Sequence, residues 1–221
     1  MARSDYHLSN SMIGFLFKVI SRLQGYEYSI ASTEEDLQAA YRLRESIFAD
    51  ELFGEKIHYP DRYDPHSTVL LAWHRGEVIG TVRLIRVEKS SLALDCYNFA
   101  LPEHVERAQV LEFGGLVVSR QHRGKGKYAF LGMCDLAFQY SLKHGYLWWM
   151  GVATLNKIEY FRKLNKDSRV LSVDKPLPQH LKNRELYPGY FTEGKNPPRP
   201  FLMDNRKGSY LGAILGALKR K

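Results

Sequence analysis

The stretch from Val110 to Tyr128 reads Val-Leu-Glu-Phe-Gly-Gly-Leu-Val-Val-Ser-Arg-Gln-His-Arg-Gly-Lys-Gly-Lys-Tyr, and the expected fold is built around it. Residues 110–118 are rich in β-branched and aromatic side chains, which is typical of a buried strand. Two features are unusual for such a strand. Glu112 places a charge among apolar neighbours, and Gly114-Gly115 weakens the ladder in mid-strand, which predicts a bulge or a close backbone approach.

A glycine-rich turn at residues 120–126 leads from this strand into an amphipathic helix, whose apolar stripe is Leu131, Cys134 and Phe138. A turn that feeds the N-terminus of a helix presents unpaired backbone amides, and three cations lie there: Arg123, Lys125 and Lys127. The combination predicts a phosphate site. The alternative is a basic surface turn with nothing bound.

The segment Gln121-His-Arg-Gly-Lys-Gly126 resembles the Gln/Arg-x-x-Gly-x-Gly/Ala pyrophosphate loop of the GNAT superfamily of acyltransferases. In that superfamily the loop follows a bulged strand, which splays from its neighbour so that pantetheine binds along it. The resemblance implies an α/β (α+β) fold with a mixed, mostly antiparallel sheet, a splayed central strand pair and flanking helices. It also implies a set of residues that bind the acyl donor: Leu116, Val118, Gln121, Arg123, Gly124, Lys125, Gly126 and Lys127.

Composition limits the class of protein. A chain of 221 residues with 44% hydrophobic residues is long enough for one well-packed domain. The net charge of +8 predicts attraction to an acidic partner such as nucleic acid, anionic lipid or an acidic carrier protein. Only Cys96 and Cys134 are present, and their spacing argues against a disulfide framework or a zinc site. We therefore expect a cytoplasmic protein.

We expect three parts along the chain: an amphipathic helix in residues 1–25, a GNAT-like acyltransferase domain in residues 26–200, and a basic amphipathic tail in residues 201–221. The N-terminal helix either packs on the domain or lies on a membrane surface. Its apolar run is too short to span a bilayer. The two ends together predict a peripheral contact with the inner membrane surface, and the apolar stripe of the helix is Ile13, Leu16, Phe17, Ile20 and Leu23.

The remaining elements follow from hydrophobic periodicity and turn residues. A capping box of Ser32 and Glu35 predicts the start of a helix. Strands are expected at residues 26–30, 68–73, 78–87, 146–153, 168–173 and 186–192, with a hairpin turn at residues 75–77 and a helix at residues 155–164.

Two arginines fall at apolar positions: Arg44 on the inner stripe of its helix and Arg83 in a strand that is apolar on both faces. A buried guanidinium is costly unless it meets carboxylates or a ligand anion. Asp61, Asp64 and Glu112 are the nearest supply of negative charge. The alternative for Arg44 is a side chain that reaches the rim of the domain. The His and Asp residues of segment 58–66 lack the spacing of a metal site, so no metal is expected.

In order along the chain, Arg44-Glu-Ser-Ile-Phe48, Asp61-x-x-Asp64, Gly80-Thr-Val-Arg83-Leu and Glu112 resemble the signature of the N-acyl-homoserine lactone synthases. The long-chain N-acyl amino acid synthases share much of this layout, and the similarity covers about residues 35–165. The resemblance implies a polar site for the amine substrate. Arg83 and Glu112 are its catalytic candidates, and the substrate-binding candidates are Arg44, Phe48, Asp61 and Asp64.

Glu112 is the candidate base. An amine that arrives as ammonium must lose a proton before it attacks a thioester carbonyl, and a carboxylate accepts that proton directly or through water. The alternative is that Glu112 only neutralises a buried arginine, and the two roles can coexist.

Two departures from the resemblance matter. Homoserine lactone synthases have an arginine after this glutamate, where this chain has Phe-Gly-Gly, which favours a free amino acid over S-adenosylmethionine. Many GNAT enzymes protonate the leaving thiolate with a tyrosine. The matching position here is Phe161, and Tyr160 lies about 100° around the helix from it.

The leading hypothesis is an N-acyltransferase that makes an N-acyl amino acid from a long-chain acyl carrier protein, with acyl-CoA as the other donor and no permanently bound cofactor. The first alternative is a homoserine lactone synthase. The second is a non-catalytic GNAT-like domain that binds membrane or nucleic acid. A terminal Lys219-Arg220-Lys221 without interleaved aromatic residues argues against nucleic acid. Core packing or an acyl tunnel would account for Phe113, Trp148 and Trp149.

Overall fold

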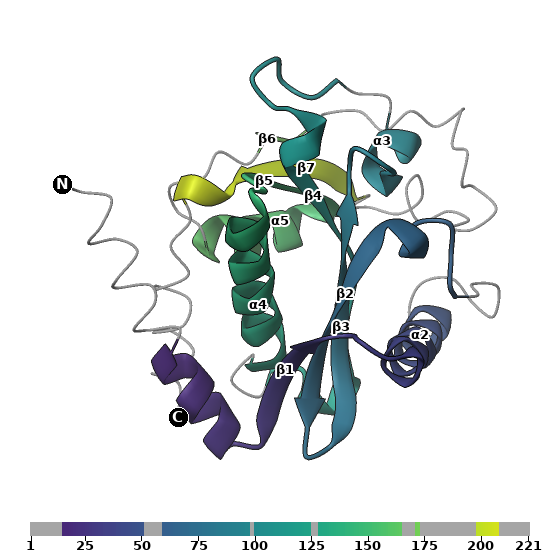
Figure 1. Cartoon of the computed structure of the whole chain (residues 1–221), viewed down its shortest axis with the longest axis vertical. Coiled ribbons are helices and arrows are strands. Elements are labelled where there is room, and N and C mark those ends of the chain that lie inside the picture. Colours follow the sequence, from purple (N-terminus) through teal and green to yellow (C-terminus); the bar gives the residue numbers. More distant parts are fainter. Residues whose placement is uncertain are drawn as a thin grey trace.

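A seven-stranded sheet in the order β1-β2-β3-β4-β5-β7-β6 runs through the computed structural model (Figure 1). The structure describes residues 15–50, 59–97, 100–124, 128–164, 171–172 and 198–207. Neighbouring strands are antiparallel except for β4 and β5, so the expected mixed, mostly antiparallel sheet is confirmed. The strands are β1 Tyr26–Ile30, β2 Ser67–His74, β3 Glu77–Arg86, β4 Val110–Val118, β5 Trp148–Ala153, β6 Leu171–Ser172 and β7 Arg199–Asp204.

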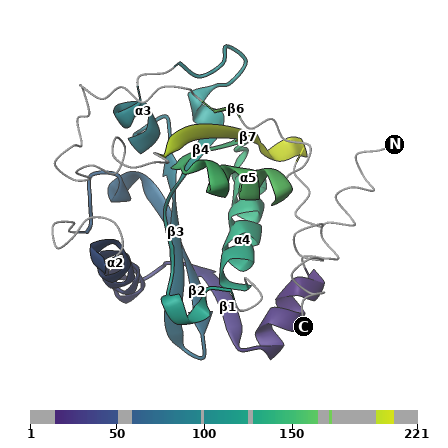
Figure 2. The same ribbon diagram turned by 180° about the vertical axis from the view of Figure 1, so that it is seen from behind.

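Helices cover both faces of the sheet. One face carries α2, and the opposite face carries α4 and α5, as the two opposite views show (Figures 1 and 2). The main core lies between α4 and the sheet, and a smaller apolar cluster of Ala40, Val69 and Leu71 lies under α2. The helices are α2 Glu34–Phe48, α3 Leu92–Cys96, α4 Tyr128–His144 and α5 Leu155–Leu164, together with a helix at residues 15–23. No described helix is long and apolar enough to cross a bilayer.

Local sequence explains where these elements begin and turn. The β2–β3 hairpin turns at Arg75 and Gly76, with φ of 52° and 85°, and positive φ at both central residues matches the right-handed twist of the strands. The capping box of α2 uses Thr33 and Asp36, one residue beyond the expected pair. The reason is that the Asp36 carboxylate accepts hydrogen bonds from the backbone N–H groups of both Ser32 and Thr33.

The splayed strand pair is present. Among the described residues, β4 pairs with β5 only from Val110 to Phe113, and from Gly114 to Val118 it pairs with β3 alone. β5 continues instead with β7 as its partner. The register between β3 and β4 shifts beside Gly115, whose φ of 59° is a left-handed conformation that glycine adopts without strain. Because β5 pairs no further than Phe113, the β5-side edge of β4 has no strand partner in the described part of the chain over its second half.

Three features of the fold differ from the sequence expectations. β7 crosses the expected domain boundary at residue 200, so residues 201–204 belong to the sheet. Pro200 near the start of this strand hides the strand pattern. The five-residue α3 lies between two expected strands where the sequence predicts no helix, because so short a helix shows no periodicity. Strand β5 begins at Trp148 rather than at residue 146. The strand expected at residues 186–192 and the tail from residue 208 lie outside the described residues.

Candidate active site

Arg83 is the centre of a buried ionic cluster. Its Nη1 and Nη2 atoms donate to Oδ1 and Oδ2 of Asp61 at 2.6 and 2.8 Å, a bidentate pair. Nη1 also lies 3.0 Å from Oδ2 of Asp64. The guanidinium carbon is 5.5 Å from the ring centroid of Tyr63, which is fully buried. Arg83 is thus held by two carboxylates and an aromatic face.

Arg44 joins the same cluster from α2. Its side chain is 0% exposed, and its Nη1 atom donates to Oδ1 of Asp64 at 2.8 Å, so Asp64 bridges the two arginines. The rings of Tyr41 and Tyr59 lie 5.7 and 5.5 Å from the guanidinium carbon, and Phe48 packs against Tyr59 at 6.4 Å. A side chain that reaches the rim is therefore excluded for Arg44. The structure brings together Arg44, Phe48, Asp61, Asp64 and Arg83.

The loop from Asp61 to Asp64 is shaped by its own carboxylates. Oδ2 of Asp64 accepts from the backbone N–H of Asp61 at 2.9 Å, and Oδ1 of Asp61 accepts from the N–H of Tyr63 at 2.8 Å. Aspartate side chains commonly stabilise turns in this way. Because the same oxygens also meet the arginines, the loop holds both carboxylates in place for ion pairing.

Glu112 lies on the same face of the sheet as this cluster but has other direct partners. Its Oε2 accepts a hydrogen bond from Ser91 Oγ at 2.6 Å, and the N–H of Ala93 lies 3.0 Å from Oε1. Glu112 therefore caps the start of α3, and Arg83 acts on it only through a longer-range Coulomb interaction. Burial raises the pKa of Glu112 to about 7, although its hydrogen bonds and Arg83 act to lower it.

Sequence reasoning missed the residues that hold Glu112. Ser91 and Ala93 lie about twenty positions before the glutamate, in a stretch where the sequence predicts no helix or strand. One local signal was present: Ser91 is followed by Leu-Ala-Leu, and its Oγ accepts from the N–H of Leu94 as a helix N-cap.

The glycine-rich loop continues directly from the free edge of β4. Residues Arg120–His122 form a 3₁₀ turn, Arg123 Nε donates to the carbonyl of Val118 at 2.7 Å, and Gly124 has a φ of 84°. Leu116 and Val118 are half-buried on the strand, and Gln121 lies in the turn. Lys125, Gly126 and Lys127 lie outside the described residues.

An unexpected histidine pair connects this loop to the hairpin. His122 Nε2 lies 3.3 Å from His74 Nδ1, and His122 Nδ1 lies 2.8 Å from Ser119 Oγ. The loop is thereby fixed to the end of β2.

The other aromatic candidates belong to the core. Trp149 is fully buried and donates its Nε1–H to Ser141 Oγ at 2.8 Å, and Phe113 packs against it at 5.0 Å. Phe161, at the position of the GNAT tyrosine, is buried and stacks on Phe201 at 5.1 Å. These contacts support core packing for the aromatic residues.

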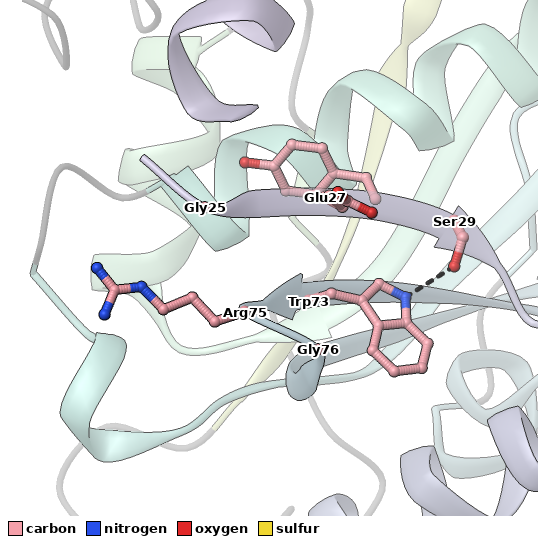
Figure 3. Close-up of a pocket in the computed structure, with 7 residues that line it drawn as sticks. Gly25, Glu27, Ser29, Trp73, Arg75 and Gly76 are labelled. Atoms are coloured by element: carbon pink, nitrogen blue, oxygen red, sulfur yellow. Dashed lines mark hydrogen bonds between the residues drawn. The ribbon is translucent and has the colours of Figure 1, made fainter. Parts of the chain in front are cut away.

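The structure also has a pocket away from this cluster. It is lined by residues of β1, the end of β2 and the β2–β3 turn (Figure 3). Trp73 donates its Nε1–H to Ser29 Oγ at 2.9 Å within it. None of the expected site residues is among those that line it: Gly25, Glu27, Tyr28, Ser29, Trp73, Arg75 and Gly76. We therefore assign the candidate site to the α2 face of β3 and β4 and to the free edge of β4.

Solved structures with a similar fold include an N-acyl amino acid synthase and acyl-homoserine lactone synthases. The structure is similar to FeeM, an N-acyl amino acid synthase from uncultured soil microbes, with a TM-score of 0.61 and 10% identity, covering 81% of this chain and 90% of that one. It is also similar to two CoA-dependent acyl-homoserine lactone synthases. MesI has a TM-score of 0.61 and 14% identity, covering 86% and 93% of the two chains. BjaI with MTA has a TM-score of 0.59 and 19% identity, covering 88% and 99%. No curated protein matches the chain.

The family model that matches is that of the N-acyl amino acid synthase FeeM, over residues 39–164. This range includes Arg44, Asp61, Asp64, Arg83 and Glu112, as well as the whole of β4 and the glycine-rich loop. Because more than half of the 221 residues match, the chain belongs to the N-acyl amino acid synthase FeeM family and is an N-acyltransferase rather than a non-catalytic binding domain.

Proposed function

We propose that this enzyme transfers a long-chain fatty acyl group from a phosphopantetheine thioester to the amine of a free amino acid. The observation that carries the proposal is that a single strand has both a buried carboxylate and an edge without a strand partner among the described residues. β4 has Glu112 on its α2 face, and its free edge begins at Gly114 and runs to the glycine-rich loop. A thioester lying along that edge would have its carbonyl beside the polar cluster and its phosphate at the loop.

The proposed reaction is aminolysis of the thioester. The ammonium gives a proton to Glu112, directly or through water, and the neutral amine then forms a C–N bond with the thioester carbon. The C–S bond breaks as the tetrahedral intermediate collapses, the nitrogen loses its surplus proton, the leaving thiolate takes up one proton, and Glu112 returns the proton it accepted to solvent. Backbone N–H groups on the free edge of β4 are suited to stabilise the oxyanion. A carboxylate whose pKa is near 7 is well matched to accept a proton near neutral pH.

The proposed donor is acyl carrier protein, with acyl-CoA as the alternative. Net charge of +8 and the exposed Arg120 and Arg123 beside the loop suit an acidic carrier. The solved homoserine lactone synthases MesI and BjaI are described as CoA-dependent, which keeps the second donor in consideration. S-adenosylmethionine is the alternative acceptor, and the Phe-Gly-Gly that follows Glu112, where homoserine lactone synthases have an arginine, favours a free amino acid.

The proposed location is the cytoplasm, with peripheral contact to the inner membrane surface. The helix at residues 15–23 lies alongside α4 and buries Phe17 between Tyr28 and Tyr128 (Figure 1). Its exposed apolar residues span an arc of about 100° at 100° per residue, and they are Phe15, Leu16, Val19 and Leu23. An amphipathic helix with such a face and two cations, Lys18 and Arg22, is suited to an anionic surface.

The test is a direct assay of the purified protein. Long-chain acyl carrier protein and acyl-CoA are each incubated with a panel of amino acids and with S-adenosylmethionine, and products are identified by mass spectrometry. We expect an N-acyl amino acid, and slower formation of it by a Gly124→Val variant at a donor concentration below the wild-type KM. An acyl-homoserine lactone as the main product would overturn the proposed acceptor, and no acyl product from any pair would overturn the proposed reaction.

A further inference from the structure

Arg44 has a guanidinium edge that nothing in the described chain satisfies. Nη1 is paired with Asp64, whereas Nε and Nη2 have no hydrogen-bond partner among the described residues although both atoms are buried. Buried polar groups nearly always have a hydrogen-bond partner. The free-energy cost of leaving a buried donor without a partner is largest when the donor is charged. The two unpaired atoms share one edge of the planar group, and their N–H bonds form the fork that binds a carboxylate bidentately.

The surroundings of this edge do not supply the missing acceptor. The rings of Tyr41 and Tyr59 lie 5.7 and 5.5 Å from the guanidinium carbon, and an aromatic face is a much weaker hydrogen-bond acceptor than a carboxylate. Gly115 packs on the face of the guanidinium, since an added Cβ would lie 3.2 Å from Nε and 3.5 Å from both Cδ and Cζ of Arg44. Gly115 is half-buried, at the bulge where β4 loses β5 as a partner. The guanidinium therefore lies against the bulge of β4, where the missing side chain of Gly115 leaves room for it.

A second unpaired polar atom lies on the same face of the sheet. Thr81 is fully buried, and its Oγ1 has no hydrogen-bond partner in the described part of the chain. Thr81 is the cross-strand partner of Leu71, which packs under α2, so its side chain also points to the α2 side. On its other side, the cross-strand partner of Thr81 is Val117 of β4, two residues beyond Gly115.

We propose that the Nε–Nη2 edge of Arg44 binds the α-carboxylate of the amino-acid acceptor, with Thr81 Oγ1 as an additional donor. The inference rests on the proposed function and deepens it, because it requires a free carboxylate next to the amine. A carboxylate held there orients the amine toward the free edge of β4, where the donor thioester would lie. The donor phosphate is expected at the glycine-rich loop, at the far end of that edge, so the two anions do not compete.

The test compares the best amino acid from the panel with its carboxamide, which keeps the amine and side chain but lacks the carboxylate. We expect kcat/KM to be roughly 10- to 100-fold higher for the acid, the range of a charge-assisted bidentate pair. In Arg44→Lys, which keeps a cation for Asp64 but loses the fork, the acid and the amide should differ by less than about threefold. The KM for the acyl donor should stay unchanged.

A second variant and a binding measurement keep the inference testable if Arg44→Lys fails to fold. Thr81→Val removes only the hydroxyl and should raise the KM of the acid several-fold while leaving that of the amide unchanged. Thr68→Val is the matched control, because Thr68 Oγ1 bonds Tyr140 on the other side of the sheet. The acid alone should also raise the melting temperature of the wild type more than the amide does.

The outcomes separate this inference from the proposed function. Equal use of acid and amide by the wild type would overturn carboxylate binding at Arg44 while leaving acyl transfer intact. Acid selectivity that survives in both variants would move the carboxylate site elsewhere. No acylation of either compound would overturn the proposed function, and equal melting shifts by acid and amide would then overturn the Arg44 site independently.

Discussion

At the scale of single residues, the site depends on buried charges that compensate one another. Asp64 is the residue that both arginines share, and it also holds the N–H of Asp61. Removing one partner of a buried ion pair leaves an uncompensated charge, which costs more than the pair itself contributes.

Asp64→Asn should therefore lower the free energy of unfolding by about 3–5 kcal/mol, because Arg44 would keep no carboxylate partner. The measurement is urea denaturation near neutral pH. Glu159→Gln is the control, since it breaks an exposed ion pair with Arg162 and should cost less than about 1 kcal/mol. A loss from Asp64→Asn no larger than that of the control would contradict the buried-cluster account.

Glu112→Gln tests the base. It keeps the size of the side chain and an acceptor oxygen for Ala93 but removes proton acceptance, so turnover should fall by roughly 10²- to 10⁴-fold. Raising the pH should recover part of the loss, because more of the amine then arrives neutral. The measurement is kcat against pH. Ser91→Ala, which removes a hydrogen bond to Glu112 but keeps its carboxylate, should retain most of the turnover.

The pH dependence of the free energy of unfolding gives a second test of Glu112. Burial raises the pKa of Glu112 from 4.5 to about 7, so the folded state binds this proton more tightly than the unfolded state. The resulting stability is fully present below pH 4.5 and is lost as the pH rises through 7. Relative to Glu112→Gln, the wild type should lose about 3 kcal/mol across this window. If the variant differs only in this profile and keeps its turnover, Glu112 is an anchor for α3 and the base is Asp61, Asp64 or a water.

At the scale of elements, the β4 edge and the loop that follows act as one unit. The strand stops pairing with β5 at Phe113, and Arg123 folds back onto the carbonyl of Val118. The backbone itself is thus the expected contact surface for the pantetheine arm and phosphate.

Gly124→Val should raise the KM for the acyl donor by about tenfold or more, comparable to the loss of one charge-assisted hydrogen bond. The physical cause is backbone strain, since Gly124 has a φ of 84° and an added Cβ would meet nothing within 4 Å. Gly76→Val is a matched control, because Gly76 has a φ of 85° and equally open surroundings but lies in the β2–β3 turn. An equal rise in donor KM in both variants would refute a role specific to the loop.

The helix at residues 15–23 gives a prediction of its own. Replacing Phe15 and Leu23, which are 66% and 80% exposed, with serine should reduce sedimentation with anionic vesicles. Binding should also weaken with salt, since each basic residue near the surface contributes about 1 kcal/mol. Leu142→Ser is the control, because Leu142 is an exposed apolar residue on α4. Equal binding of the double variant and wild type would remove this helix from the membrane contact.

At the scale of the whole molecule, the net charge of +8 should act on the encounter with an acidic donor. We expect kcat/KM for acyl carrier protein to fall by about tenfold when ionic strength rises from 0.02 to about 0.5 M, because the Debye length shortens. An acylated pantetheine fragment without charge should show little dependence. If the carrier protein shows no more salt dependence than the fragment, steering by the net charge plays no part in donor selection.

The local elements and the composition of the site followed from the sequence alone. Residues 110–118 form the strand that their β-branched and aromatic side chains predict, and the diglycine produces the expected bulge. Arg44 and Arg83 are buried, as their apolar positions predict. The prediction is possible because hydrophobic periodicity depends only on residues that are close together in the chain.

Only the tertiary structure decided which groups meet. Asp64 rather than Glu112 bridges the arginines, and Glu112 turns instead to Ser91 and the N–H of Ala93. The helix at residues 15–23 buries Phe17 but exposes Leu16 and Leu23 of the same apolar stripe. In each case the partners come from segments far apart in the chain. Their contacts depend on how the faces of the sheet and helices pack, and no local period or spacing encodes that choice.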